Sequence, residues 1–289
     1  MQTVRTIEEV RSIVRSARLD GKGIGFVPTM GYLHRGHTSL VEHSKKLSGF
    51  QVMSIFVNRI QFNDAGDFSR YPRDLERDLA VARDCGVDLV FAPGDDEMYR
   101  DRRTFVDMEL LTDHLCGAHR PGHFRGVFTV VSKLFNIVLP DVAVFGQKDI
   151  QQAVSLEKMV MDLDFPLKIV IAPTVREEDG LAMSSRNKHL DPDERRRSLC
   201  IIRSLRMAEG MIASGERSAR KILSEVKKEL STGRPDKIDY ASLVRYSDLQ
   251  PADEISERSV LAVAAFFGPT RLIDNMIVEE REGKFSCVY

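Results

Sequence analysis

Short apolar runs alternate with longer amphipathic stretches along the first 174 residues of the chain. The apolar runs cover residues 23–27, 51–57, 87–91, 141–145 and 167–171, and such continuous runs are typical of parallel strands buried on both faces. Apolar positions at helical spacing predict helices at residues 39–47, 74–85, 126–138 and 150–161. Thr6-Ile7-Glu8-Glu9 has the form of a capping box and predicts one more helix at the amino terminus. This alternation predicts an α/β fold with a doubly wound parallel sheet.

The pattern changes after about Thr174. Asp191-Pro192-Asp193-Glu194 reads as a helix start, and two charged amphipathic helices follow to about Leu230. Strand-like runs then occupy residues 238–244, 260–266 and 271–277. We therefore expect two domains, residues 1–174 and residues 175–289, of which the second is smaller and of the α+β class.

Composition limits the classes of partner. The 289 residues are 43% hydrophobic and 29% charged, as in an ordinary globular protein. The formal net charge of -1 provides no overall field for nucleic acid or an anionic membrane, so we expect neither as a partner. Four scattered cysteines form no CxxC pair, and no stretch approaches the roughly 20 apolar residues of a membrane span. These features predict reduced thiols and a cytoplasmic location.

The first apolar run leads into Pro28-Thr29-Met30-Gly31-Tyr32-Leu33-His34-Arg35-Gly36-His37 and then into a helical pattern. Backbone N–H groups at the start of a helix favour an anion, and two imidazoles three residues apart would face the same anion. Gly36 lacks a side chain where a phosphate would approach. A metal half-site is an alternative, but the Glu of an HExxH motif is absent; a structural capping role also stays open.

Polar segments also follow the other predicted strands, at the edge where open α/β sheets bind ligands. They are Asn58-Arg59-Ile60-Gln61-Phe62, Gly146-Gln147-Lys148-Asp149 and Pro173-Thr174-Val175-Arg176. Lys148 would pair with phosphate charge, unless it is simply a lysine of a solvated turn. Ser184-Ser185-Arg186 supplies hydroxyl donors and a guanidinium suited to a triphosphate, or else a helix cap. The chain contains neither GxxxxGK[ST] nor GxGxxG, so a nucleotide would need another cradle.

Taken together, these segments resemble the pantothenate synthetase family, whose members join pantoate to β-alanine using ATP. The resemblance covers about residues 26 to 191 in order, which is far more specific than any single motif. It rests on residues 28–31 with 34–37, residues 56–58 with 61–62, residues 71–73, residues 120–126 with 129–131, residues 145–149 with 151–152, and residues 173–187.

The resemblance implies a Rossmann-like sheet of the nucleotidylyl-transferase type that binds ATP and pantoate, with the C-terminal domain as a lid. It implies catalytic roles for His34, His37, Lys148, Ser184, Ser185 and Arg186. The ATP site would also include Pro28, Met30, Gly31, Gly36, Gly146, Asp149, Val175 and Met183. Gln61 and Gln152 would hold pantoate, with Gln61 also near β-alanine, and Asn58, Tyr71 and Arg120 are further substrate-binding candidates.

The implied reaction has two steps. The pantoate carboxylate attacks the α-phosphate of MgATP and releases pyrophosphate, and the β-alanine amine then attacks pantoyl adenylate to give pantothenate and AMP. The resemblance also implies a homodimer and a Mg²⁺ site, for which Asp78 is a candidate ligand.

Two departures and two rival functions accompany the resemblance. Arg59 stands where members usually carry proline, and Arg77 stands beside Asp78 where acidic residues are common. One rival function is a nucleotidyltransferase that makes a dinucleotide, and the other is a regulatory nucleotide-binding module without turnover.

Overall fold

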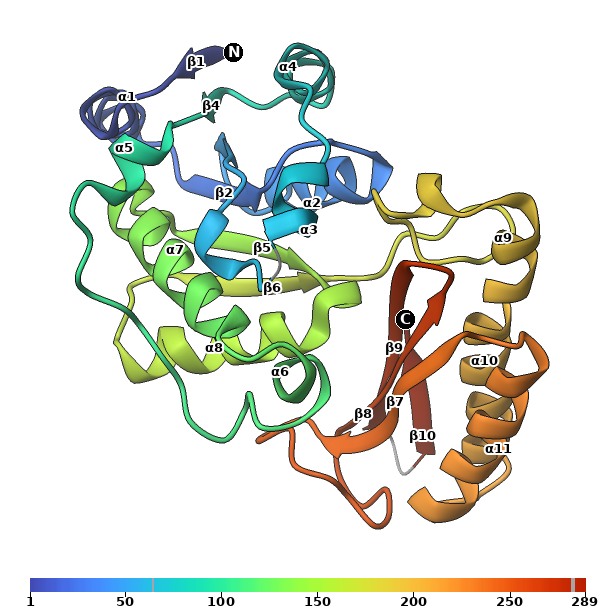
Figure 1. The fold of residues 1–289 in the computed structure, drawn as a ribbon. Helices are drawn as coiled ribbons and strands as arrows, with labels where there is room; N and C mark the ends of the chain where they lie inside the picture. Colours follow the sequence, from blue (N-terminus) through green and yellow to red (C-terminus); the bar gives the residue numbers. More distant parts are fainter. Residues whose placement is uncertain (64, 282–283) are drawn as a thin grey trace. The chain divides into compact units, whose positions relative to one another are not determined.

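The computed structural model describes residues 1–63, 65–281 and 284–289 (Figure 1). The chain forms two compact units. The first comprises Met1–Met108, Arg120–Gly146 and Ser155–Ala172, and the second comprises Glu109–His119, Gln147–Val154 and Pro173–Tyr289. The expected division into functional domains at residues 174 and 175 stays a prediction.

Six parallel strands of the described chain form the sheet of the first unit, in the order β1-β4-β3-β2-β5-β6. This sheet confirms the predicted α/β fold, and all five expected strands are present. The edge strand β1 was not predicted, because three residues are too few to show a periodic pattern. The bounds are β1 Gln2–Val4, β2 Ile24–Thr29, β3 Phe50–Ile55, β4 Leu89–Phe91, β5 Val142–Gly146 and β6 Lys168–Ala172.

The predicted helices around this sheet are α1 (Ile7–Leu19), α2 (Arg35–Lys45), α4 (Leu75–Asp84), α7 (His123–Val138) and α8 (Ile150–Asp162), whose first turn belongs to the second unit. The capping box of Thr6 and Glu9 is formed at α1. The pattern missed η1 (Arg59–Gln61), α3 (Ala65–Arg70) and α5 (Asp95–Tyr99), since one or two turns are too short for a helical period.

Helices cover both faces of this sheet because successive side chains of a strand point in opposite directions. Val27 of β2 joins a core with α2 and α4 that includes Leu40 and Ala82. The preceding residue, Phe26, meets Phe135 of α7 at a ring-centroid distance of 6.4 Å. The two-sided burial explains why the strands read as unbroken apolar runs.

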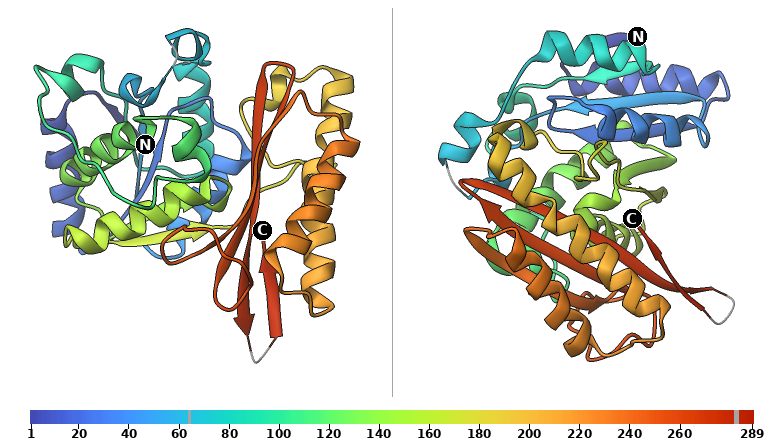
Figure 2. Two further views of the ribbon diagram at one scale, coloured as in Figure 1. Left: turned by 60° about the horizontal axis from the view of Figure 1, so that its bottom comes forward. Right: turned by 90° about the vertical axis from the view of Figure 1, so that its right-hand side faces the viewer.

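The second unit contains an antiparallel sheet in the order β10-β9-β8-β7, with helices lying along one face (Figure 2). Leu205 of α10 and Ile222 of α11 share a core with Leu261 of β8 and Met276 of β9. This confirms the predicted α+β class, although α6, α9 and β10 were not expected as separate elements. The bounds are α6 Leu115–His119, η2 Gln147–Asp149, η3 Asn187–His189, α9 Pro192–Ser198, α10 Cys200–Ala213, α11 Ala219–Thr232, β7 Lys237–Arg245, β8 Ser259–Phe267, β9 Thr270–Arg281 and β10 Lys284–Val288.

Among the described helices, none combines the length and the apolar character needed to cross a membrane.

Candidate active site

At its carboxyl end, β2 pairs with only one of its two neighbouring strands. β2 pairs with β3 as far as Thr29, but its register with β5 includes only Gly25 and Phe26. Pro28, which has no N–H to donate, therefore lies beyond the last pair with β5. Since β3 follows β2 in the chain and β5 does not, this is the topological switch point, where open α/β sheets bind ligands.

The turn after β2 is held by a buried carboxylate. Asp78 of α4 is 1% exposed, and its two oxygens accept the backbone N–H groups of Tyr32 at 2.6 Å and Leu33 at 2.7 Å. Gly31 has φ +84°, and a Cβ built there would lie 2.8 Å from Asp78 Oδ2. Arg77 donates to the Leu33 carbonyl at 2.9 Å. The turn is thus fixed in one conformation, and glycine is required at residue 31.

These contacts give Asp78 a structural role that sequence reasoning missed. Its candidacy as a magnesium ligand stays a prediction. Within the described residues, no group of three or more His, Cys, Asp and Glu side chains is arranged to hold a metal ion.

The two histidines cap helix α2 reciprocally. His34 Nδ1 accepts the N–H of Gly36 at 3.1 Å, and His37 Nδ1 accepts the N–H of His34 at 3.3 Å. The ring centroids are 4.1 Å apart. Because an N–H group can only donate, both Nδ1 atoms are unprotonated, and in the neutral rings Nε2 carries the hydrogen. The capping role and the proposed anion role are therefore compatible: one nitrogen fixes each ring, and the other is a donor.

A buried amide network surrounds Gln61. Asn58 Nδ2 donates to Gln61 Oε1 at 2.8 Å and to the Gly126 carbonyl at 3.1 Å, while the Tyr99 hydroxyl donates to Asn58 Oδ1 at 2.6 Å. Gln61 Nε2 lies 3.2 Å from Met30 Sδ. The first unit thus brings together Met30, Asn58 and Gln61, three residues predicted for the site.

Two residues of this network were not predicted. Burial raises the pKa of Tyr99, so its hydroxyl stays a hydrogen-bond donor to Asn58. A Cβ at Gly126 would lie 2.5 Å from the Ile60 carbonyl, so only glycine lets α7 approach this loop. The motif containing Gly126 was noticed, but no sequence signal marked Tyr99.

The remaining candidates of the first unit lie at the margin of this network. Arg120 Nη1 lies 3.1 Å from His123 Nε2, and His123 Nδ1 lies 2.8 Å from the Gln61 carbonyl. Tyr71 contacts the Phe62 ring edge-to-face at 5.7 Å. Arg59 is exposed at the first position of η1.

In the second unit, Lys148 and Asp149 lie in η2 directly before α8. Lys148 is 20% exposed, and its Nζ lies 3.9 Å from Asp149 Oδ2, a distance at which an ion pair is weak. Gln151 is buried and donates to the carbonyls of residues 111 and 114 at 2.8 Å each. Gln152 is only partly buried, and its amide makes no hydrogen bond to the described residues. Of these two adjacent amides, the one predicted to bind pantoate is thus the one without a hydrogen bond among the described residues.

Residues 175–183 form a small hairpin. Arg176 and Ala182 make an antiparallel bridge, and the Met183 N–H donates to the Val175 carbonyl at 2.9 Å. Beyond it, Ser184 Oγ accepts the N–H of Arg186 at 3.2 Å. Five of the predicted ATP-binding residues, Val175, Met183 and Ser184 to Arg186, thus lie on one continuous segment.

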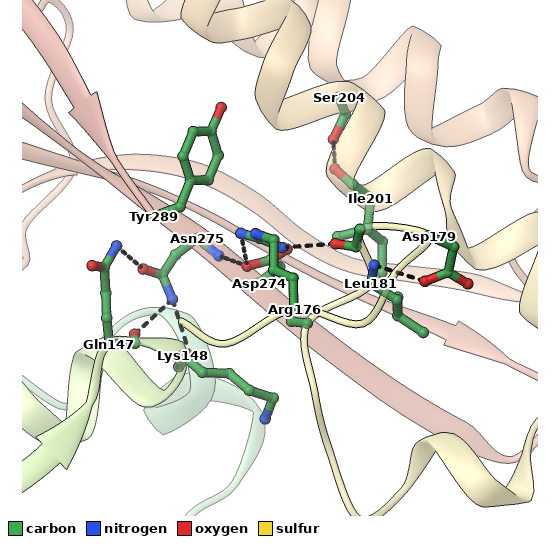
Figure 3. Close-up of polar contacts among 12 residues, drawn as sticks. Gln147, Lys148, Arg176, Asp179, Leu181, Ile201, Ser204, Asp274, Asn275 and Tyr289 are labelled. Carbon is green, nitrogen blue, oxygen red and sulfur yellow. Dashed lines mark hydrogen bonds and ion pairs between the residues drawn. The ribbon is translucent and has the colours of Figure 1, made fainter. Parts of the chain in front are cut away.

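Salt bridges join this hairpin to other parts of the second unit. Arg176 binds both oxygens of buried Asp274, at 2.7 and 3.1 Å (Figure 3). Arg195 binds Glu177 and Asp179, each at 2.7 Å. Partial burial acts to raise the pKa of Asp179, but the hydrogen bonds from Arg195 and the Leu181 N–H outweigh it and lower that pKa. Asp274 was not predicted. The sequence did offer a signal, because two polar residues, Asp274 and Asn275, stand in succession inside the strand-like run at 271–277.

Comparisons with known proteins identify the family of this chain. A family model described as pantoate-beta-alanine ligase matches residues 2–277. The pantothenate synthetase of Thermoanaerobacter sp. (strain X514) is 53% identical over 272 residues, which cover 94% of this chain and 96% of the relative.

Solved structures agree with this match. The pantothenate synthetase of Thermus thermophilus superposes with a TM-score of 0.90 at 44% identity, covering 95% of this chain and 98% of that one. The pantoate-beta-alanine ligase of Francisella tularensis, solved in complex with beta-gamma ATP and beta-alanine, has a TM-score of 0.78 at 32% identity and covers 95% and 97% of the two chains. The chain therefore belongs to the pantoate-beta-alanine ligase family.

Proposed function

We propose that this chain condenses pantoate with β-alanine at the expense of ATP and forms pantothenate, AMP and pyrophosphate. The observation that carries the proposal is the family match over residues 2–277. The Francisella tularensis relative, solved with beta-gamma ATP and beta-alanine, supports the assignment of ATP and β-alanine as substrates. The product is a precursor of coenzyme A.

The proposed mechanism passes through pantoyl adenylate. The pantoate carboxylate attacks the α-phosphorus of ATP, the bond from that phosphorus to the bridging oxygen breaks, and pyrophosphate leaves. The β-alanine amine then attacks the acyl carbon and displaces AMP. A carboxylate is a poor acyl donor, so adenylation supplies the leaving group, and the protein has mainly to position reactants and stabilise charge.

The residues proposed to act on ATP are those that the resemblance implied from the sequence. In the first unit, His34 and His37 donate from Nε2 to charge developing at the α-phosphate. In the second unit, Lys148, Ser184, Ser185 and Arg186 bind phosphate oxygens. The backbone and side chains that contact ATP include those of Pro28, Met30, Gly31, Gly36, Gly146, Asp149, Val175 and Met183.

Pantoate is proposed to bind through amides. Gln61 is oriented by Asn58, and Gln152 has a side chain with no hydrogen bond to the described residues, so both can satisfy hydroxyl and carboxylate oxygens. Gln61 also lies near β-alanine in this proposal. Tyr71 and Arg120 are further candidates for binding the substrates.

We propose that Mg²⁺ binds chiefly to the ATP phosphates, as it usually does in nucleotide enzymes. Asp78, the candidate ligand from the sequence, already accepts two backbone N–H groups. A homodimer and a cytoplasmic location complete the proposal. Sedimentation at micromolar concentration tests the dimer.

An assay of AMP and pyrophosphate with each substrate omitted tests the function. We expect pyrophosphate only when pantoate, ATP and magnesium are all present, and pantothenate only when β-alanine is added. A stable nucleotidyl product in place of the amide would identify a dinucleotide-forming transferase. Nucleotide binding without turnover would identify a regulatory module.

A further inference from the structure

Two neighbouring residues of β9 bind the two segments of the second unit that we propose to bind phosphate (Figure 3). Asp274 binds Arg176 of the hairpin through two hydrogen bonds. Asn275 binds the turn that carries Lys148. Both side chains are buried, at 2% and 1% exposure, and the proposed reaction assigns no role to either.

The side chain of Asn275 binds the backbone on both sides of Lys148. Its Nδ2 donates to the Gln147 carbonyl at 2.9 Å and to the Lys148 carbonyl at 3.0 Å. The first carbonyl belongs to the peptide before Lys148, and the second belongs to the peptide after it. Holding both peptide planes fixes φ and ψ of Lys148, and therefore the direction in which its side chain leaves the backbone.

The amide of Asn275 is itself held in place. Its Oδ1 accepts from Gln147 Nε2 at 3.4 Å, and the same Nε2 donates to the Val288 carbonyl at 2.8 Å. Its backbone N–H donates to Asp274 Oδ1 at 2.9 Å. A side chain used only to fill space would not need an oriented amide, since an apolar residue of the same shape fills a core as well.

We infer that Asn275 is a positioning residue for the adenylation step, because it sets the direction of the Lys148 side chain. The inference rests on the proposed role of Lys148 at the ATP phosphates. Small displacements of a group that stabilises a transition state can lower the rate by roughly 10²-fold. Asn275 touches no reacting atom in this proposal, so it acts only through Lys148.

A double-mutant cycle on the full-length protein tests the inference. The measured quantity is pantoate-dependent exchange of pyrophosphate into ATP, which reports adenylation alone. We expect Asn275→Leu to lower its kcat by roughly 10² with little change in KM for pantoate. Lys148→Ala should lower kcat by about 10² to 10³. In Lys148→Ala protein, adding Asn275→Leu should change the rate less than about twofold, because no lysine is left to position.

Asn275→Ser serves as a second variant if Asn275→Leu fails to fold, since a water can bind the two carbonyls beside the smaller side chain. Ser204→Ala is the matched control: it removes a buried hydrogen bond of 2.7 Å to the Ile201 carbonyl in the same unit and should leave kcat unchanged.

Three results would overturn the inference: independent, multiplying effects of the Asn275 and Lys148 changes, a loss in the Ser204 control of the same size, or full activity of folded Asn275→Leu. Failure of the proposed function is recognised separately, because the unmodified protein would then form no pantothenate.

Discussion

At the residue scale, two glycines of the candidate site have different surroundings. Gly31 has φ +84° and faces Asp78, so the protein itself demands glycine there. Gly146, at the end of β5, is different: a Cβ built on it would have Leu40 Cδ2, at 3.9 Å, as its nearest non-adjacent neighbour. The fold therefore tolerates a methyl group at Gly146, and the reason that we propose for glycine there is the approach of ATP.

This contrast predicts opposite outcomes for two alanine substitutions. Gly31→Ala should lower the free energy of unfolding by at least about 1 to 2 kcal/mol, because alanine disfavours positive φ. Gly146→Ala should leave that free energy within about 1 kcal/mol of the parent but reduce adenylation by roughly 10²-fold. Chemical denaturation and pyrophosphate exchange measure the two effects. Unchanged adenylation in Gly146→Ala would remove Gly146 from the ATP site.

The histidines supply a second prediction at this scale. His34→Ala and His37→Ala should each lower the adenylation rate by about 10² to 10³, the usual loss for one donor aimed at developing charge. His43→Ala is the matched control, because it lies on α2 outside the first turn. Since His34 is also the N-cap, its variant should lose about 1 kcal/mol of stability as well. Rates near the parent value in either folded variant would exclude the proposed role.

At the element scale, the turn between β2 and α2 depends on α4. Asp78→Asn should destabilise the fold by about 1 to 3 kcal/mol, because an amide can accept only one of the two buried N–H groups that the carboxylate now binds. Adenylation should fall with the displaced turn. Asp84→Asn, at the exposed end of the same helix, is the control and should change stability by less than about 0.5 kcal/mol. A neutral Asp78→Asn would show that Asp78 does not hold the turn.

The loop of η1 provides a milder test. Arg59 is exposed at the first position of this turn, where proline is tolerated because that N–H has no partner in the turn. Arg59→Pro should be neutral or stabilising by up to about 1 kcal/mol, with activity retained. Arg59→Ala is the control, because it removes the arginine side chain without adding the proline ring. Loss of activity in folded Arg59→Pro, but not in Arg59→Ala, would mean that the loop must flex.

Elements with a repeating pattern were predictable, and contacts between distant residues were not. The five buried strands and the main helices followed from apolar periodicity. The short elements η1, α3 and α5 gave no period to detect. The roles of Tyr99 and Asn275 depend on hydrogen bonds across 41 and 127 residues of sequence, which no local pattern encodes. Most of the residues named for the site came from the resemblance to a known family, while the residues that orient them came only from the structure.

At the scale of the whole molecule, each unit has its own core and presents its own set of polar groups. The first unit offers His34, His37 and the amide of Gln61, and the second offers Lys148 and the segment of Ser184 to Arg186. A ligase that forms a mixed anhydride must exclude water from that intermediate, since water would hydrolyse it. In the proposed mechanism, adenylation precedes the attack of the β-alanine amine, so it should proceed without β-alanine.

Trapping tests that order of events. Enzyme incubated with MgATP and pantoate, then treated with hydroxylamine, should yield pantoyl hydroxamate without any β-alanine. Because the carboxylate oxygen attacks phosphorus and leaves with it, ¹⁸O placed in the pantoate carboxylate should appear in AMP after the amide forms. Omitting ATP is the control and should give no hydroxamate. Pantothenate formed from labelled pantoate with no label in AMP would exclude pantoyl adenylate and would indicate attack at another phosphorus.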